Sequence, residues 1–293
     1  MFKFYNSKKN FLGLQNSSLE KSKAIIIPFG YEKTVSYGKG TSKGPEEMLK
    51  ASQQLELYDE DFQCEPSETI LPLTLKKPSI PKKEIDGLIK LQRIVEEVLN
   101  LNKFPLTFGG EHTITTACIK ALLKKEKSLT ILQFDAHADL RSSYENNTLS
   151  HACTMRRCLD NKNIDLISIG VRSMSKNEAA YSNKNKKRIT SLLAKDIDKW
   201  NLKELRKKLK NKKVYITFDI DAFDSSLVPA TGTPEPGGLF WNDVIKILDI
   251  ASKSSKIYGA DICELSPIKS MNSCNFLAAK LAYKILSYSL LKN

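Results

Sequence analysis

The chain has 293 residues, a formal net charge of +13 and a hydrophobic content of 41%. This composition excludes a disordered, collagenous or repetitive protein, and the length allows a large buried core. No apolar run reaches the roughly 20 residues that span a bilayer, and the N-terminus lacks the pattern of a signal peptide, so we expect a cytoplasmic protein. The six cysteines have no CxxC spacing, which argues against a disulfide framework and a thiolate zinc site.

The positive charge is distributed in short Lys-rich stretches at 124–127, 184–188 and 206–213. These stretches lack interleaved aromatic residues and match no nucleic-acid-binding module. Solvated helix faces and loops account for most such stretches. We therefore expect neither nucleic acid nor a membrane as a partner, and nucleic-acid binding on a basic face remains a weak alternative.

Short apolar runs predict buried strands, and segments with helical spacing lie between them. The alternation predicts an α/β fold with a parallel sheet. No linker or change of composition divides the chain, so we predict an N-terminal extension at 1–20 and one domain at 21–293. The extension is polar and aperiodic, and could lie over the surface or reach a neighbouring subunit. In chain order, strands are expected at 24–29, 105–108, 129–134, 165–171, 213–218 and 257–262, and helices at 84–100, 113–123, 202–209, 241–251 and 276–291.

Polar residues directly follow four of the predicted strands. Ligands of open α/β sheets bind beyond the carboxyl ends of the strands, so these positions are candidate functional sites. An extended chain points residues i, i+2 and i+4 to one side, so we expect Asp135, His137 and Asp139 to converge, and likewise Asp219 and Asp221. The four groups are Gly-Gly-Glu-His at 109–112, Asp-Ala-His-Ala-Asp at 135–139, Asp-Ile-Asp at 219–221, and Glu264.

Such a cluster of carboxylates would raise its own pKa values unless a cation neutralised it. The chain has only three histidines, and each lies in or beside one of these groups, which chance would rarely produce. A mostly oxygen ligand set suits Mn²⁺, although Ni²⁺, Co²⁺ or Zn²⁺ can occupy similar ligands. Four aspartates balance two divalent ions, leaving a neutral site that can bind and acidify a water molecule. The predicted metal ligands are His112, Asp135, His137, Asp139, Asp219 and Asp221.

These motifs, in this order, resemble the arginase/agmatinase (ureohydrolase) family. The resemblance also includes the loop Pro-Ala-Thr-Gly-Thr-Pro-Glu-Pro-Gly-Gly at 229–238 and the segment Tyr-Gly-Lys-Gly-Thr-Ser-Lys-Gly-Pro at 37–45. It covers most of the chain, from about residue 24 to residue 290.

The resemblance implies a single three-layer domain with a parallel, roughly eight-stranded sheet and a di-manganese centre at its carboxyl edge. The implied reaction is hydrolysis of a guanidino compound to urea and an amine. The family commonly forms trimers or hexamers, so a homo-oligomer is expected. By the family pattern, one ion binds His112 and Asp139, the other binds His137 and Asp221, and Asp135 and Asp219 bridge them.

The resemblance also suggests catalytic roles for His151, Glu264 and Asp139. Glu264 matches the position that pairs with the guanidinium group, and its charge suits a cationic substrate. His151 is a candidate proton shuttle and substrate contact, because an unperturbed imidazole titrates near neutral pH. Thr233 either contacts substrate or shapes its turn, and Asp224 could simply fix the loop after its strand.

The loops near the site favour the agmatinase-like branch. Arginases bind the amino-acid end of arginine with polar residues that are not matched here by Leu-Arg-Ser-Ser-Tyr at 140–144 or Gly-Val-Arg-Ser-Met-Ser at 170–175. The stretches at 149–157 and 51–58 resemble the agmatinase branch. Agmatine hydrolysis to putrescine, a step of polyamine biosynthesis, is the leading expectation; guanidinobutyrase, arginase and formimidoylglutamase are alternatives.

Three arginines near these motifs, Arg141, Arg156 and Arg172, could bind a substrate carboxylate or form structural ion pairs. We favour structural roles, since such arginines commonly pair within the protein.

Two other classes of protein were compared with the same motifs. A zinc deacetylase of the histone-deacetylase type has a related sheet, but it would use one metal and a His-His pair, and this sequence has no adjacent histidines. A non-catalytic binding descendant would typically have lost metal ligands, whereas all six positions are filled here.

Overall fold

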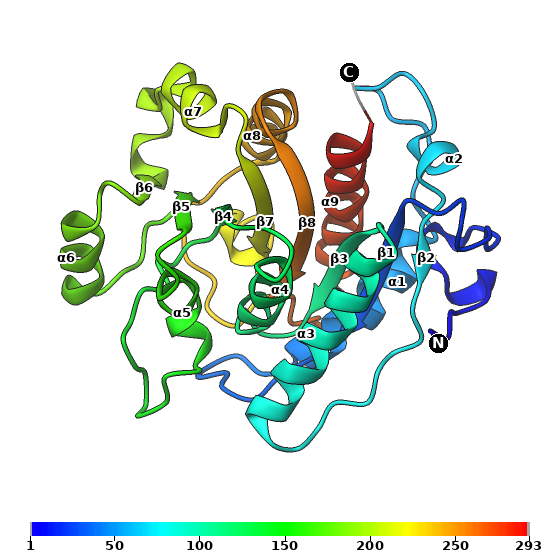
Figure 1. Ribbon diagram of the computed structural model, residues 1–293, viewed down its shortest axis with the longest axis horizontal. Coiled ribbons are helices and arrows are strands. Elements are labelled where there is room, and N and C mark those ends of the chain that lie inside the picture. The colour runs from blue at the N-terminus through cyan, green and yellow to red at the C-terminus, as the bar shows by residue number, and fades with distance from the viewer. Residues whose placement is uncertain (1, 292–293) are drawn as a thin grey trace.

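The computed structural model describes residues 2–291 and is built around an eight-stranded, all-parallel sheet (Figure 1). The strand order is β2-β1-β3-β8-β7-β4-β5-β6. This confirms the predicted single α/β domain with a parallel, eight-stranded sheet. The strands are β1 (Ala24–Phe29), β2 (Leu73–Thr74), β3 (Phe104–Gly109), β4 (Leu129–Phe134), β5 (Ile164–Ile169), β6 (Ile189–Leu192), β7 (Lys213–Asp219) and β8 (Lys256–Cys263).

Helices cover both faces of the sheet, which gives the domain three layers (Figure 1). One face packs against α1 (Gly44–Ser52), α7 (Leu202–Leu209), α8 (Trp241–Ser254) and α9 (Asn272–Leu290). The other face packs against α3 (Glu84–Asn100), α4 (Ile114–Leu122) and α5 (Thr154–Leu159). The remaining helices are α2 (Pro66–Ile70), α6 (Lys176–Lys184) and the 3-10 turns η1 (Ser7–Lys9), η2 (Phe11–Gly13), η3 (Thr41–Lys43), η4 (His151–Cys153), η5 (Ala194–Lys199) and η6 (Ile220–Ala222).

The inner strands are mostly apolar because both of their faces are covered. Every residue of β1, β3 and β4 is buried, as expected for a parallel sheet between two helical layers. All six predicted strands are present. The sequence pattern missed β2 and β6, because β2 has only two residues and β6 is buried at just one of its four positions.

The predicted helices are also present, with shifts at their ends. The helices α3 and α7 have the predicted bounds, whereas α9 begins at Asn272 and α8 continues to Ser254. The short helices α1, α2, α5 and α6 were not predicted. Their five to nine residues give too few turns for a clear apolar period.

The strand register brings the ends of β4, β7 and β8 to one level. Phe134 on β4 pairs with Phe218 on β7, so the following residues, Asp135 and Asp219, leave the sheet side by side. Asp219 in turn pairs with Cys263, the last residue of β8. The candidate site therefore lies at the carboxyl edge of the sheet centre.

The N-terminal segment packs against the sheet edge of its own chain. Phe4 forms an antiparallel bridge with Leu75, which follows β2. Asn10 and Phe11 are fully buried, and the ring of Phe11 packs edge-to-face on Phe108 of β3. The segment expected to be a polar extension therefore contributes side chains to the core.

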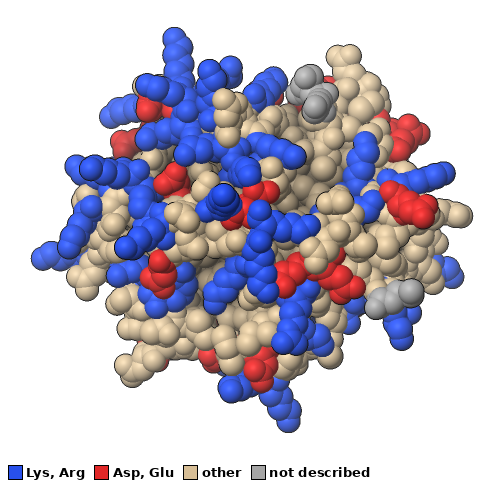
Figure 2. Space-filling view, viewed as in Figure 1, with Lys and Arg blue, Asp and Glu red and all other residues tan. Residues whose placement is uncertain are grey.

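The surface carries basic groups without one dominant patch on the face seen in Figure 2. Lys and Arg side chains are spread over that face, and acidic groups lie among them. Some form surface ion pairs, for example Lys124 with Glu96 at 2.8 Å. Within residues 2–291, no helix is long and apolar enough to cross a membrane.

Candidate metal centre

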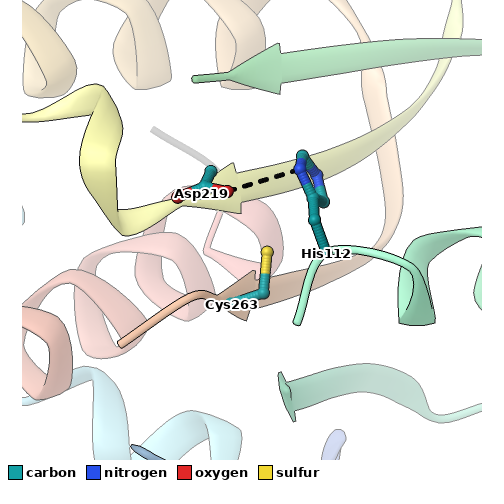
Figure 3. Close-up of side chains that lie close together, drawn as sticks. All are labelled: His112, Asp219 and Cys263. Carbon is teal, nitrogen blue, oxygen red and sulfur yellow. Dashed lines mark ion pairs between the residues drawn. The ribbon is translucent and has the colours of Figure 1, made fainter. Parts of the chain in front are cut away.

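The first group of predicted ligands gathers around His112, in the turn between β3 and α4. Its Nδ1 lies 3.0 Å from Asp139 Oδ2, 3.1 Å from Asp135 Oδ2 and 3.4 Å from Asp219 Oδ2. Figure 3 shows His112 and Asp219 facing each other, with Asp219 at the tip of β7. All four side chains are almost completely buried.

The second group lies around His137. Its Nδ1 is 2.9 Å from Asp221 Oδ2 and 3.6 Å from Asp135 Oδ1. The ligand atoms of His112, Asp135 and Asp139 are close enough to hold one ion, and those of Asp135, His137 and Asp221 a second. Asp135 belongs to both groups, which is the arrangement expected of a bridging ligand.

The expectation that these residues converge on extended chain is wrong. The strands end at Phe134 and Asp219, and the chain turns sharply after each. Asp135 Oδ1 accepts the backbone N–H of His137 at 2.6 Å, and Asp219 Oδ1 accepts that of Asp221 at 3.0 Å. Asp139 has a left-handed backbone with φ of 51°. Asp135 and Asp219 thus each accept a hydrogen bond from the backbone N–H two residues later, and these turns bring the ligands together.

The donor set fits a divalent cation. The buried Nδ1 of His112 has no hydrogen-bond partner within residues 2–291, although three carboxylate oxygens surround it. Burial and the nearby Asp135 raise the pKa of Asp139 to about 7, and burial and Asp221 raise the pKa of Asp219 well above its usual value. Carboxylates packed this closely are stabilised in their charged form by a cation.

Cys263 lies beside this cluster and was not predicted as part of it. Its sulfur lies within 4.8 Å of ligand atoms of His112 and Asp219, and Figure 3 shows the three side chains together. Burial and the nearby carboxylates raise the pKa of the thiol well above its usual value, and its S–H donates to the carbonyl of Phe218 at 3.6 Å. Thiolate is a soft ligand, whereas carboxylate oxygens suit Mn²⁺, so we leave Cys263 out of the candidate ligand set.

A buried network of hydrogen bonds contacts Nε2 of His112, the ring nitrogen that does not face the aspartates. Its Nε2 lies 2.8 Å from the hydroxyl oxygen of Thr217, and this hydroxyl donates to Asp261 at 2.7 Å. Asp261 also accepts hydrogen bonds from Tyr215 and Thr115, at 2.7 and 2.9 Å. The signal that could have revealed this network is an aspartate inside an otherwise apolar strand.

Glu264 follows β8 directly and is placed at the floor of a cavity. Its backbone is left-handed, with φ of 63°, and its N–H donates to the carbonyl of Gly110. Its Oε1 accepts the backbone N–H of His112 at 2.7 Å. Burial, together with the charge of Glu111, raises the pKa of Glu264.

The cavity has a volume of about 290 Å³ and reaches the surface near Tyr37, which is 80% exposed. Five acidic side chains line it, against the single guanidinium of Arg141. Three of these carboxylates are candidate metal ligands and Glu178 lies beside Arg141, so Glu264 is the acidic group left to attract a cationic ligand. The lining includes His137, Asp139, Asp219, Asp221 and Glu264 from the candidate centre, together with Thr233, His151, Tyr144, Arg141 and Glu178.

Of the remaining predicted site residues, two line the cavity and one has a structural role in a loop. His151 and Thr233 line the cavity, and burial lowers the pKa of His151. Asp224 accepts hydrogen bonds from the backbone and hydroxyl of Ser226 and from the backbone of Gly238, which lower its pKa to about 2. Asp224 therefore fixes the loop after β7.

The three arginines have different surroundings. Arg172 donates to backbone carbonyls, among them those of Asp221 and Glu235 at 2.8 Å, so its role is structural without an ion pair. The guanidinium of Arg156 lies 3.7 Å from the ring centre of Tyr181. Arg141 alone lines the cavity.

Comparison with known proteins agrees with this geometry. Residues 22–287 match the arginase family. An N(1)-aminopropylagmatine ureohydrolase from Synechocystis is 33% identical over 98% of this chain and 95% of its own length. An agmatinase from Pyrococcus horikoshii is 33% identical over 90% of this chain and 91% of its own length. The crystal structure of an agmatine ureohydrolase from Thermoplasma volcanium has a TM-score of 0.80 at 29% identity, covering 93% of this chain and 92% of that one.

The chain therefore belongs to the arginase family of metal-dependent hydrolases. Within this family it is an agmatinase-like ureohydrolase.

Proposed function

We propose that this enzyme hydrolyses agmatine to putrescine and urea, with two Mn²⁺ ions bound by the six predicted ligands. The observation that carries the proposal is a cavity lined by residues from both groups of candidate ligands and by Glu264. Such a cavity suits a small linear cation with a guanidinium at its inner end.

When bound, the metal pair would supply an acidified water molecule as the nucleophile at neutral pH. The residues of the chain would hold the substrate around this water. Glu264 would bind the guanidinium by its carboxylate, whose Oε1 is already oriented by the backbone N–H of His112. Asp139 lines the same cavity as Glu264. His151 also lines it and would carry a proton to the leaving amine.

The charge of the cavity favours agmatine over substrates with a carboxylate tail. Arg141 is the one guanidinium in the lining, and it is already close to Glu178, with Nε to Oε2 at 3.7 Å. The same guanidinium lies 5.0 Å from the ring centre of Tyr144. The nearby Glu178 carboxylate partly offsets the charge of Arg141, which weakens its attraction for the carboxylate of arginine or guanidinobutyrate.

A second candidate substrate is N(1)-aminopropylagmatine. It is the substrate named for the Synechocystis relative, which matches almost the whole chain. The cavity reaches the surface at Tyr37, so a longer polyamine tail could continue beyond the mouth. This tail would meet Tyr37 without having to displace the side chains around the candidate centre.

The test is urea release by the Mn²⁺-loaded enzyme from agmatine, N(1)-aminopropylagmatine, arginine and guanidinobutyrate, and formamide release from formimidoylglutamate. We expect kcat/KM to be highest for agmatine and on the order of 10-fold lower for arginine and guanidinobutyrate, because the guanidinium in the lining is already next to Glu178. A higher value for N(1)-aminopropylagmatine would replace agmatine by the second candidate. Urea release from none of the guanidino compounds would contradict the proposed function.

A further inference from the structure

Thr34 connects His151 to a buried carboxylate that belongs to neither group of candidate metal ligands. The hydroxyl oxygen of Thr34 lies 3.2 Å from His151 Nδ1 and accepts the backbone N–H of the same histidine at 3.0 Å. It also donates to Glu111 Oε1 at 2.9 Å. Thr34 thus touches the ring and the backbone of the proposed shuttle and is anchored on Glu111.

Glu111 holds Thr34 in a fixed place. Its side chain is fully buried, and its Oε2 accepts the backbone N–H groups of Lys33 and Thr34 at 2.7 and 2.6 Å. Its own N–H donates to the carbonyl of Tyr31, and a Cβ added at Gly110 would lie only 2.0 Å from that oxygen. The two segments can approach this closely because residue 110 is glycine.

The hydrogen atoms around Thr34 can be counted. A hydroxyl has one proton to donate and two lone pairs to accept with. The backbone N–H of His151 can only donate, so it uses one lone pair. The carboxylate of Glu111 is the stronger acceptor and lies closer than His151 Nδ1, so it receives the proton. The remaining lone pair faces Nδ1, which must therefore carry a hydrogen.

We infer that Thr34, anchored by Glu111, fixes neutral His151 in the tautomer with the proton on Nδ1. Nε2 is then left bare as the nitrogen that takes and returns a proton in the cavity. In a neutral imidazole, the hydrogen bond made by one nitrogen decides the state of the other. Thr34 acts through His151 without touching the reacting atoms, so it is a positioning residue. This inference rests on the proposed role of His151.

The direct test is nitrogen NMR of protein labelled with ¹⁵N-histidine and loaded with Zn²⁺, which is diamagnetic. The chain has only three histidines, so the signals of His151 are assigned by comparison with His151→Gln. Above the pKa of His151, we expect a protonated Nδ1 and a bare Nε2. A bare Nδ1 in the wild-type protein would overturn the inference, and this spectrum requires no variant of Thr34 to fold.

Two variants separate positioning from general packing. Thr34→Val removes the hydroxyl and keeps the shape, and it should give a mixture of tautomers and lower kcat on the order of 10-fold, a fraction of the 10²–10⁴ typical of general acid–base catalysis. Thr34→Ser keeps the hydroxyl and should keep both the tautomer and most of kcat. Unchanged tautomer and kcat in Thr34→Val would contradict the proposal.

Thr154→Val is the matched control, because the hydroxyl of Thr154 donates to the backbone carbonyl of His151 and not to its ring. It should keep the wild-type tautomer. Loss of that tautomer in the control would show that any disturbance of the loop changes the tautomer, which would contradict a specific role for Thr34. The NMR result is obtained without substrate. A failure of the proposed function, seen as no urea release, is therefore distinguishable from a failure of this inference.

Discussion

His112 Nε2 lies 2.8 Å from the hydroxyl oxygen of Thr217. Because that hydroxyl donates its proton to Asp261, it accepts from His112, and the ring hydrogen of His112 sits on Nε2. In the neutral ring that binds a metal, Nδ1 is then bare, and it lies beside the carboxylates of Asp139 and Asp135. The network behind the ring thus selects which nitrogen is offered to a metal ion.

Thr217→Val should therefore weaken metal binding, because it removes the acceptor that holds His112 in this tautomer. We expect Mn²⁺ affinity to fall about 10- to 100-fold, the usual effect of losing such a supporting partner. Thr217→Ser keeps the hydroxyl and should bind almost as the wild type. Calorimetric titration of the metal-free proteins with Mn²⁺ measures both, and equal affinity of the Val variant and the wild type would refute this role.

His151→Gln should separate metal binding from turnover. His151 lines the cavity and belongs to neither group of candidate ligands, so the variant should retain its metal content. Its kcat for agmatine should fall by about 10²–10⁴, as expected for loss of a general acid–base group. Elemental analysis and urea release on the same preparation measure both quantities; full turnover at every pH would end the shuttle assignment.

The pH dependence of the wild-type enzyme follows from the burial of His151, which lowers its pKa below the ordinary 6.5. A lowered pKa keeps the ring neutral further into the acid range, so activity that needs a bare Nε2 is lost only as the pH falls through this lower value. The acid limb of kcat/KM for agmatine should have its midpoint below 6.5, and His151→Gln should lack that limb. An acid limb with a midpoint above 6.5 that is absent in His151→Gln would contradict the lowered pKa of His151.

Lys284 on α9 makes a separate contribution, to stability. Its side chain is fully buried, and its Nζ contacts Asp59 at 2.7 Å and Asp61 at 2.6 Å. Lys284→Met leaves the buried carboxylate of Asp59 without its cation, so the free energy of unfolding should fall by about 3–5 kcal/mol. Denaturant unfolding measures this change.

A surface pair provides the control for that experiment. Lys253 pairs with Asp249 at 2.7 Å while 47% of its side chain is exposed. Lys253→Met should cost no more than about 1 kcal/mol. Equal losses in the two variants would show that burial of the Lys284 cluster has no special effect.

Much of the fold could be predicted from the sequence, because strands covered on both faces are mostly apolar. The runs at 24–29 and 129–134 became β1 and β4 without change. Edge strands are half-exposed and short, so β6 carries no comparable pattern. The burial of Phe11 was missed for a related reason, since one apolar residue in a polar segment has no period.

The candidate site could be predicted only in part. Each of the six ligands stands beside a strand end, where its type and position are visible in the sequence. Thr34 and Thr217 act through contacts with residues about 80 and 40 positions away, at Glu111 and Asp261, and nothing in the local sequence marks these threonines. The turns that aim Asp135 and Asp219 likewise depend on hydrogen bonds to the backbone, which the extended-chain rule ignores.

The central claim is that six side chains form one centre for two metal ions, and the number of Mn²⁺ ions bound per chain tests it most directly. Elemental analysis of the loaded wild type should give two ions, and Asp219→Ala should give fewer, because the family pattern assigns Asp219 as a ligand of both ions. Cys263→Ala, which alters the neighbouring side chain in Figure 3, should still give two. One ion in the wild type, or two in Asp219→Ala, would contradict the account.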